Sequence, residues 1–402
     1  MRKLHALNIR GRLGRWLADF LTGREQCVIV NGKKSGMQPV ISGVPQGSVL
    51  GPLIFLVLIG DIDKEVVQAF LSSFADDTRV GLGIDTDEDV DLLQQDLERV
   101  YTWSETNNMQ FNGDKFEALR YTNKSTPGDR KGYTSNTGAA IKEKASLTDL
   151  GVIMSNDASF TKHITSVVQR VTKKSGWALR TFNARDRTTM LTLWKSLILP
   201  HHDYCSQLWS PLKTGLIQKL ELLQRSFFRK IHGMRQLSYW EQLIALRARS
   251  LERRRERYMI IYVWRILEGQ VPNLNSTVIE TTSDATSRIG RLCHVPHVSN
   301  QAPAFVKKAR DASLPIRGVK LFNAIPKELR NITGCKTDSF KAALDRFLAT
   351  IPDEPLIPGY TAGRRCSTNS IIEWVQTLQR QQDLVQPTMH GQDGEAAPQR
   401  DL

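Results

Sequence analysis

A ten-residue loop, Gly43–Pro52, and the apolar segment that follows it are the features that most constrain the fold of this chain. The loop contains three glycines and two prolines, and the apolar segment Val49–Ile62 predicts a buried helix with Pro52 in its first turn. Glycine lets another surface approach the backbone, proline stiffens it, and a helix N-terminus favours phosphate. No Gly-Lys-Ser/Thr follows, so this is not the Walker phosphate loop. The loop alone leaves open both a binding loop and an ordinary cap on a core helix.

Two adjacent carboxylates, Asp76 and Asp77, interrupt the apolar stretch Phe70–Leu82 and predict two strands joined at an acidic turn. Like charges this close repel each other, and partial burial raises the cost. A bound Mg²⁺ reverses that balance, because it prefers carboxylate and phosphate oxygens as ligands. Two such ions can hold the attacking and the leaving oxygen of a phosphoryl transfer. Asp is also common in plain turns, so a purely structural turn is the alternative.

The positive charge of the chain is concentrated in its middle. The 402 residues carry a net charge of +14, and residues 101–270 contain 28 Lys or Arg against 14 Asp or Glu. This excess indicates a polyanionic partner, either nucleic acid or an acidic membrane surface. An inward apolar stripe on the Arg-rich helix disfavours the membrane, while a solvated helix face stays an alternative. The arginines predicted to contact the phosphates of nucleic acid are Arg247, Arg249, Arg253, Arg254, Arg255 and Arg257.

Hydrophobic periodicity and turn residues predict an α+β chain. Helices are expected at 2–22, 87–106 and 370–381 and throughout 158–270, a hairpin around Asn31-Gly32, and strand pairs at 70–82 and 109–121. The expected division is a first domain at 1–157, a basic helical region at 158–270, a linker at 271–300, a small, mostly helical region at 301–381 and a disordered polar tail at 382–402.

Cysteine usage and apolar run lengths predict an intracellular protein, in the nucleus or the cytoplasm. Five widely spaced cysteines argue against a secreted disulfide scaffold. Cys293, His294, His297 and Cys335 match no structural zinc spacing. The first residues contain no apolar signal core, and the longest apolar run, Leu53–Ile59, is far shorter than the ~20 residues of a membrane span. We therefore expect no signal peptide, no transmembrane segment and no membrane partner.

Two segments together resemble a known family. The resemblance rests on GVPQGSVLGPLIFLVLIGDI (43–62) and SSFADDTRV (72–80), which are similar to the reverse transcriptase domain of jockey-like non-long-terminal-repeat retrotransposons. Further similarity lies in NGDKFEAL (112–119), LTDLGVIMSNDASFTKHI (147–164), HHDYCSQLWSP (201–211) and SLERRRERYMIIYVWRILEG (250–269). The resemblance extends over roughly residues 1–350.

The resemblance implies an RNA-directed DNA polymerase that extends a DNA primer on an RNA template with deoxynucleoside triphosphates (dNTPs). By this likeness Asp76 ligates the catalytic Mg²⁺ and Asp77 supports it, with two ions in the complete enzyme. Lys115 matches a lysine thought to protonate the leaving pyrophosphate. The residues that match the pocket for the templating base pair and the primer end are Gly43, Pro45, Gln46, Gly47 and Phe74.

The same resemblance implies a partial polymerase palm, an antiparallel sheet packed on helices, with primer-gripping strands at 147–153 and a helical thumb at 158–270. In this family a third catalytic carboxylate lies upstream of a helix like that expected at 4–21, and here Asp19 is the only acid before Glu25. We therefore expect an N-terminally truncated domain without that carboxylate and without the fingers, and with no useful polymerase activity by itself. The alternative is a non-catalytic nucleic-acid-binding remnant.

Overall fold

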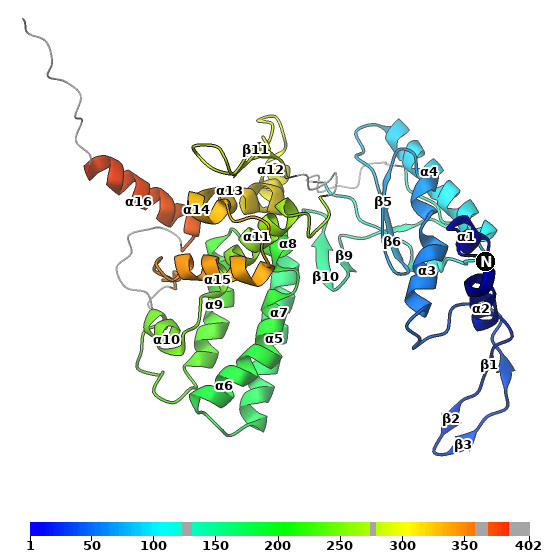
Figure 1. Ribbon diagram of the computed structural model, residues 1–402, viewed down its shortest axis with the longest axis horizontal. Coiled ribbons are helices and arrows are strands. Elements are labelled where there is room, and N and C mark those ends of the chain that lie inside the picture. The colour runs from blue at the N-terminus through cyan, green and yellow to red at the C-terminus, as the bar shows by residue number, and fades with distance from the viewer. Residues whose placement is uncertain (123–130, 274–278, 358–368, 386–402) are drawn as a thin grey trace, which may run out of the picture. The chain divides into compact units, whose positions relative to one another are not determined.

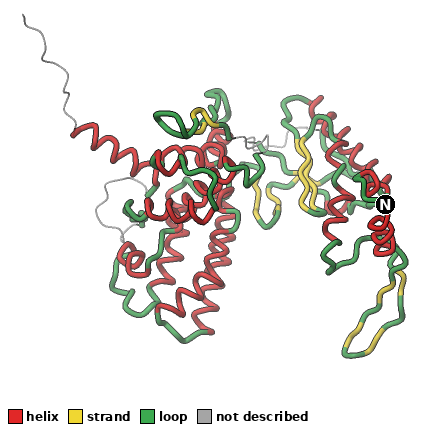
Figure 2. The backbone as a smooth tube through the Cα atoms, in the orientation of Figure 1, coloured by secondary structure: helices red, strands yellow, loops and turns green. Residues whose placement is uncertain are grey.

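The computed structural model describes residues 1–122, 131–273, 279–357 and 369–385. The chain divides into two compact units: unit 1 comprises Met1–Ala118 and Lys124–Lys144, and unit 2 comprises Leu119–Asn123 and Ala145–Leu402. Both contain helices and short two-stranded sheets, in agreement with the α+β class (Figure 1, Figure 2). Among the described helices, none combines the length and apolar character that a bilayer span requires.

The elements of unit 1 surround a small core. In chain order they are α1 (Arg2–Ala6), α2 (Gly11–Leu21), β1 (Glu25–Gln26), β2 (Ile29–Val30), β3 (Lys33–Lys34), β4 (Gln38–Pro39), α3 (Gly51–Ile59), η1 (Ile62–Glu65), β5 (Phe70–Phe74), β6 (Asp77–Gly81), α4 (Asp87–Thr106), η2 (Gly113–Lys115), β7 (Glu117–Ala118) and β8 (Lys142–Glu143). Ile59, Ile62, Val100 and Trp103 form the core between α3, η1 and α4.

Local signals placed several elements of unit 1 correctly. The Thr86 hydroxyl accepts the backbone N–H of Asp89, whose carboxylate accepts that of Thr86, and this capping box begins α4 where the helix was predicted. The hairpin around Asn31-Gly32 is confirmed by the pairing of β2 with β3. The single helix predicted at 2–22 is instead α1 and α2, because Asn8 takes a φ of 64° and turns the chain between them.

The strand pair predicted at 109–121 is wrong. That stretch forms the turn η2 and the two-residue strand β7, which pairs in parallel with β8. Phe111 and Phe116 instead surround Tyr101 of α4, with ring centroids 6.4 and 5.6 Å from its ring. The apolar alternation at 109–121 therefore reflects packing against α4 rather than pairing within a sheet.

Unit 2 begins earlier than the sequence predicted, because the hairpin β9–β10 belongs to it rather than to the first domain. Its elements are β9 (Ser146–Asp149), β10 (Val152–Ser155), α5 (Thr161–Thr181), α6 (Arg187–Leu193), η3 (Trp194–Ile198), α7 (Leu199–Asp203), α8 (Ser206–Trp209), α9 (Thr214–Phe228), α10 (Tyr239–Leu246), α11 (Leu251–Leu267), β11 (Thr281–Ser283), β12 (Leu292–Cys293), α12 (Ala304–Ala312), η5 (Leu314–Gly318), α13 (Val319–Ala324), α14 (Lys327–Arg330), α15 (Thr337–Leu348) and α16 (Ile371–Val385). Helices dominate, as expected from residue 158 onward.

Two hydrophobic cores share helix α11. The first packs α5, η3 and α9 together with Leu251 at the beginning of α11. The second packs the remainder of α11 with α13 and α15. In the second core the Trp264 ring stacks on Phe340 of α15, with the ring centroids 4.5 Å apart. Helix α11 is therefore the central helix of unit 2 rather than a surface helix.

The segment predicted as a linker at 271–300 is part of the second core. In its described residues, β11 pairs with β12, and Ile279 and Cys293 are buried among the side chains of that core. Several of the polar residues in its described part, Thr281, Thr282 and Thr286 among them, are exposed. The helix predicted at 370–381 is confirmed as α16. This helix continues to Val385, so the prediction of a disordered tail is wrong for residues 382–385. The rest of that tail, 386–402, lies outside the described residues.

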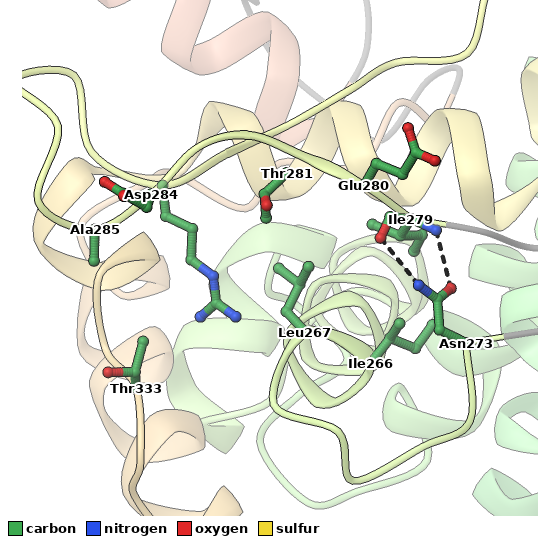
Figure 3. A pocket seen from close by; sticks show the side chains of 10 residues that line it. Ile266, Leu267, Asn273, Ile279, Glu280, Thr281, Asp284, Ala285 and Thr333 are labelled. Atoms are coloured by element: carbon green, nitrogen blue, oxygen red, sulfur yellow. Dashed lines mark hydrogen bonds between the residues drawn. The ribbon is translucent and has the colours of Figure 1, made fainter.

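A cavity of about 740 Å³ lies beside the end of α11 (Figure 3). Its apolar lining includes Ile266 and Leu267, and Asn273 closes one side through two hydrogen bonds with the backbone of Ile279. The cation that lines it, Arg291, donates to Glu268 at 2.8 Å. The cavity involves none of the residues predicted to be functional.

Buried charges surround the first turns of α11. Glu252 and Glu256 lie one helical turn apart and are buried together with Glu221 of α9. The guanidiniums of Arg255 and Arg317 oppose these three carboxylates. Burial, reinforced by the neighbouring carboxylates, raises the pKa of Glu252 to about 8. The folded unit 2 therefore keeps a proton on Glu252 at neutral pH.

Unit 2 is expected to lose stability as the pH rises from about 4.5, the ordinary pKa of glutamate, to about 8. Across this window the folded state retains a proton that the unfolded chain releases, so each increase in pH favours unfolding. Glu252→Gln stays neutral and should reduce this slope, leaving the part due to Glu221, whose pKa burial also raises, and at about pH 9 it should unfold at a higher urea concentration than wild type. Urea unfolding followed by tryptophan fluorescence measures both, and an unchanged slope would contradict the assignment to Glu252.

Candidate active site at an acidic hairpin tip

The predicted acidic turn is present at the tip of the β5–β6 hairpin. The strands pair in antiparallel register with Phe74 opposite Asp77, so Ala75 and Asp76 form the turn. Ala75 adopts a φ of 52°, which few residues other than glycine accept. Behind the turn, the hydroxyl oxygens of Ser73 and Thr78 lie 3.0 Å apart across the strands. A strained backbone is held at the point where both carboxylates emerge, as is common at functional sites.

The side chains of the tip face solvent. Asp76 and Asp77 are both exposed, and the Phe74 ring is 65% exposed. The donor set fits Mg²⁺, because two adjacent carboxylates supply hard oxygens and leave room for substrate phosphates. Within the described residues, no group of three or more His, Cys, Asp or Glu side chains is arranged to hold a metal ion. The tip alone thus presents two carboxylates.

A buried aspartate that was not predicted from the sequence, Asp96 of α4, positions the hairpin. Its carboxylate accepts the backbone N–H groups of Val67, Gln68 and Ala69 at 3.1, 2.9 and 2.8 Å, which fixes the chain entering β5. Arg99 also donates to it, at 2.6 Å. Burial alone would raise the pKa of Asp96, but these donors hold it below the ordinary value of 3.8. The available signal was an acid lying on the apolar face of an amphipathic helix.

Asp96→Ala is expected to destabilise unit 1 by about 3 kcal/mol, because three backbone N–H groups and Arg99 lose the buried carboxylate that accepts their hydrogen bonds. Hydrogen exchange at Val67, Gln68 and Ala69 should accelerate, and in wild type the same loss should appear as the pH falls through the lowered pKa of Asp96. Asp91→Asn is the matched control, since the Asp91 carboxylate is half exposed and among the described residues pairs only with Lys131, so its loss should change the stability by less than about 1 kcal/mol. Protection of these three amides in Asp96→Ala would contradict the positioning role.

The glycine–proline loop folds back onto the start of α3. The Ser48 hydroxyl donates to the carbonyl of Pro45 at 2.7 Å and accepts the N–H of Gly51 at 3.0 Å. A Cβ at Gly51 would lie 2.7 Å from the same carbonyl oxygen, so only glycine fits there. Gly43 and Gly47 both take a φ of 78°. The loop is a defined turn that caps a helix.

The residues of this loop remain available to a ligand. Gly43, Gln46 and Gly47 are exposed, and Pro45 is partly buried. Pro52 lies in the first turn of α3, as predicted. The prediction that α3 is a buried helix is wrong, because Leu53 and Leu56 are more than half exposed. The unbroken apolar sequence of α3 indicated burial on all sides, whereas unit 1 covers only one side.

Lys115 lies at the end of η2 and is exposed. In the described part of unit 1, no hydrogen bond or ion pair joins Lys115 to Asp76 or Asp77. The structure therefore presents Lys115 to solvent without bringing it into contact with the carboxylates.

The prediction that the Arg-rich run contacts phosphates needs correction for Arg253 and Arg255. Both guanidiniums are buried, with exposed fractions of 1% and 2%. Arg253 donates to the carbonyls of Pro352 and Asn369, each at 3.1 Å. A phosphate could reach these two side chains only if the centre of unit 2 opened, because α11 lies between two cores.

Three other members of the run are held by carboxylates. Arg254 makes a two-pronged contact with Asp203, at 2.8 and 2.7 Å. Arg249 and Arg257 share Asp345 of α15, at 3.0 and 2.5 Å. Only Arg247, exposed at the end of α10, keeps the solvent-facing position that the prediction assumed for all six. The charge pattern was interpreted as a surface, but half of these arginines form ion pairs with Asp203 or Asp345 and two more are buried.

Comparison with known proteins shows what the first part of the chain is similar to. Residues 1–171 match the family described as reverse transcriptase (RNA-dependent DNA polymerase). The match contains both the acidic tip and the glycine–proline loop, so these residues are similar in sequence to a reverse transcriptase domain.

Particular relatives agree with this class. The chain is similar to the RNA-directed DNA polymerases from mobile element jockey of Drosophila melanogaster and Drosophila funebris, with 28% identity over 231 and 230 residues. It is also similar to a probable RNA-directed DNA polymerase from transposon X-element of Drosophila melanogaster, with 27% identity over 226 residues. Each match covers 54% of this chain and 24 or 25% of the relative, so the chain spans about a quarter of their length. No solved structure gives a significant match.

Proposed function

We propose that this chain serves RNA-directed DNA synthesis, in which deoxynucleotides are added to a DNA primer along an RNA template. The observation that carries the proposal is the exposed pair Asp76 and Asp77 on a tight hairpin, within the residues that match the reverse transcriptase family. The similarity to RNA-directed DNA polymerases of mobile elements supports it.

Five of the predicted site residues have a specific role in this proposal. Asp76 and Asp77 would hold Mg²⁺, which when bound activates the primer hydroxyl and neutralises charge on the phosphates. The exposed Phe74 ring offers an apolar surface for the end of the primer. Gln46 projects from the rigid loop, where its amide can donate to and accept from a base or sugar. Lys115 supplies a proton or a positive charge to the leaving pyrophosphate.

A second function, nucleic-acid binding without synthesis, is favoured by the charge of unit 2. Residues 161–181, which form α5, contain five Lys or Arg and no Asp or Glu. A surface of this kind binds phosphates without requiring a catalytic site. It would act whether or not the acidic tip assembles a complete metal site.

Primer extension separates the two functions. The full chain is incubated with poly(rA)/oligo(dT), labelled dTTP and Mg²⁺, and binding of the same duplex is measured in parallel. Synthesis predicts incorporation that stops when EDTA removes the metal. Binding of the duplex without incorporation would overturn the polymerase proposal in favour of the second function.

A further inference from the structure

The outer side of α5 combines positive charge with an exposed indole ring. Arg170, Lys173, Lys174, Trp177 and Arg180 follow one another at spacings of three and four residues, which places them on one side of the helix. All five are exposed. We call these five residues the α5 face. It was not part of the site predicted from the sequence.

Packing fixes the direction of the α5 face. Ile164, Val167 and Val171 on the other side of the helix are buried in the first core of unit 2. The helix cannot rotate its charged side inward without removing these side chains from that core. The exposure of Trp177, at 45%, therefore follows from the fold rather than from loose packing.

The indole of Trp177 belongs to a small aromatic platform. Phe182, also exposed, meets it edge to face, with the ring centroids 6.2 Å apart. The Nζ of Lys174 lies 5.9 Å from the centroid of the Trp177 ring. Arg180 folds back over Gly176, where a Cβ would lie 3.2 Å from its Nη1. The Trp177 ring thus has one cation, Lys174, beside it, on a side of the helix that also carries Arg180.

The cations of the α5 face have no carboxylate partner among the described residues. No ion pair of that part of the chain includes Arg170, Lys173, Lys174 or Arg180, in contrast to the paired arginines of α11. The acid nearest in sequence, Asp186, is engaged as the N-cap of α6. Their charge is therefore available to a polyanion.

We propose that the α5 face binds single-stranded nucleic acid, with phosphates on the cations and one unpaired base stacked on Trp177. Cations alone suit a duplex equally well, because they meet only its phosphates. An exposed ring among cations suits a single strand, because only unpaired bases offer their faces for stacking. This surface uses neither Asp76 nor Asp77, so the inference extends beyond the proposed polymerase chemistry and does not depend on it.

Fluorescence anisotropy with labelled oligo(dT) and oligo(rU) strands, and with a duplex of equal length, tests the proposal on the full chain. Trp177→Ala should weaken single-strand binding by about tenfold or more and duplex binding by less than about threefold. Trp177→Phe keeps an aromatic surface and should retain affinity within about threefold of wild type. Lys173→Gln/Lys174→Gln should weaken both ligands and reduce the salt dependence of binding.

Trp240→Ala is the matched control, because Trp240 is a similarly exposed tryptophan on α10 of the same unit. It should leave both affinities unchanged, and circular dichroism confirms that each variant is folded. Equal losses for single strand and duplex in Trp177→Ala, or no loss, would overturn the proposal. Loss in Trp177→Phe equal to that in Trp177→Ala would overturn it as well, since stacking would then not be the interaction. Primer extension by Trp177→Ala is scored separately and reports on the polymerase proposal.

Discussion

Asp76→Asn is expected to abolish any Mg²⁺-dependent nucleotide incorporation that primer extension detects with this chain. An amide oxygen carries no formal charge, so a Mg²⁺ ion bound at the hairpin tip would lose a charged ligand and would be held less tightly beside the phosphates. Charge stabilisation by a bound metal amounts to several kcal/mol, and about 4 kcal/mol corresponds to a factor of about a thousand in rate. Primer extension on poly(rA)/oligo(dT) measures the loss.

The hairpin itself supplies the controls for this experiment. Asp77→Asn should reduce incorporation less, because Asp77 supports the pair from the first position of β6. Asp85→Asn, an exposed aspartate beyond the other end of β6, should retain the rate of wild type. Duplex binding should be unchanged in all three variants, since it does not require the metal. Incorporation by Asp76→Asn at the rate of Asp85→Asn would refute the assignment of the acidic tip as the catalytic centre.

The parts of the fold that local chemistry specifies were predictable from the sequence. The capping box at Thr86, the turn at Asn31-Gly32 and the acidic turn at Asp76 each need only a few consecutive residues to be recognised. The same holds for the tight loop before α3, where Gly51 is required because the carbonyl of Pro45, six positions earlier, leaves no room for a Cβ. The candidate catalytic pair was therefore found before any tertiary structure was known.

The parts that depend on distant contacts were not predictable in this way. The arginines of α11 were interpreted as a phosphate-binding surface, because the sequence does not reveal that Asp203 and Asp345 form ion pairs with them. Asp96 was overlooked, since its three partners lie nearly thirty residues earlier. A run of charges on an amphipathic helix predicts that the charged side faces solvent. In α11 that side also packs against a second core, which the sequence does not reveal.

Glu221→Ala is expected to destabilise unit 2 by about 3–5 kcal/mol, a large part of the stability of an ordinary domain. The buried carboxylate of Glu221 accepts the Tyr239 hydroxyl at 2.7 Å and the backbone N–H groups of Leu251 and Glu252 at 3.1 and 2.7 Å. It therefore caps the beginning of α11 and ties α9 to α10. Alanine leaves three buried donors without an acceptor and removes a countercharge from Arg255.

Urea unfolding followed by tryptophan fluorescence measures this loss, because Trp194, Trp209 and Trp264 are buried in unit 2. Tyr239→Phe removes one of the three donors and should cost about 1–2 kcal/mol of stability. It should therefore be less destabilising than Glu221→Ala, which affects all three hydrogen bonds. Lys219→Ala, an exposed position on the same helix, should change the stability by less than about 0.5 kcal/mol. Equal stabilities of Glu221→Ala and Lys219→Ala would show that the buried carboxylate does not hold α11 in place. We expect Glu221→Ala to be the least stable variant and Lys219→Ala the most stable, as an internal role for the acids and arginines of α11 predicts. The exposed cations of α5 are then the ones available to bind a nucleic acid.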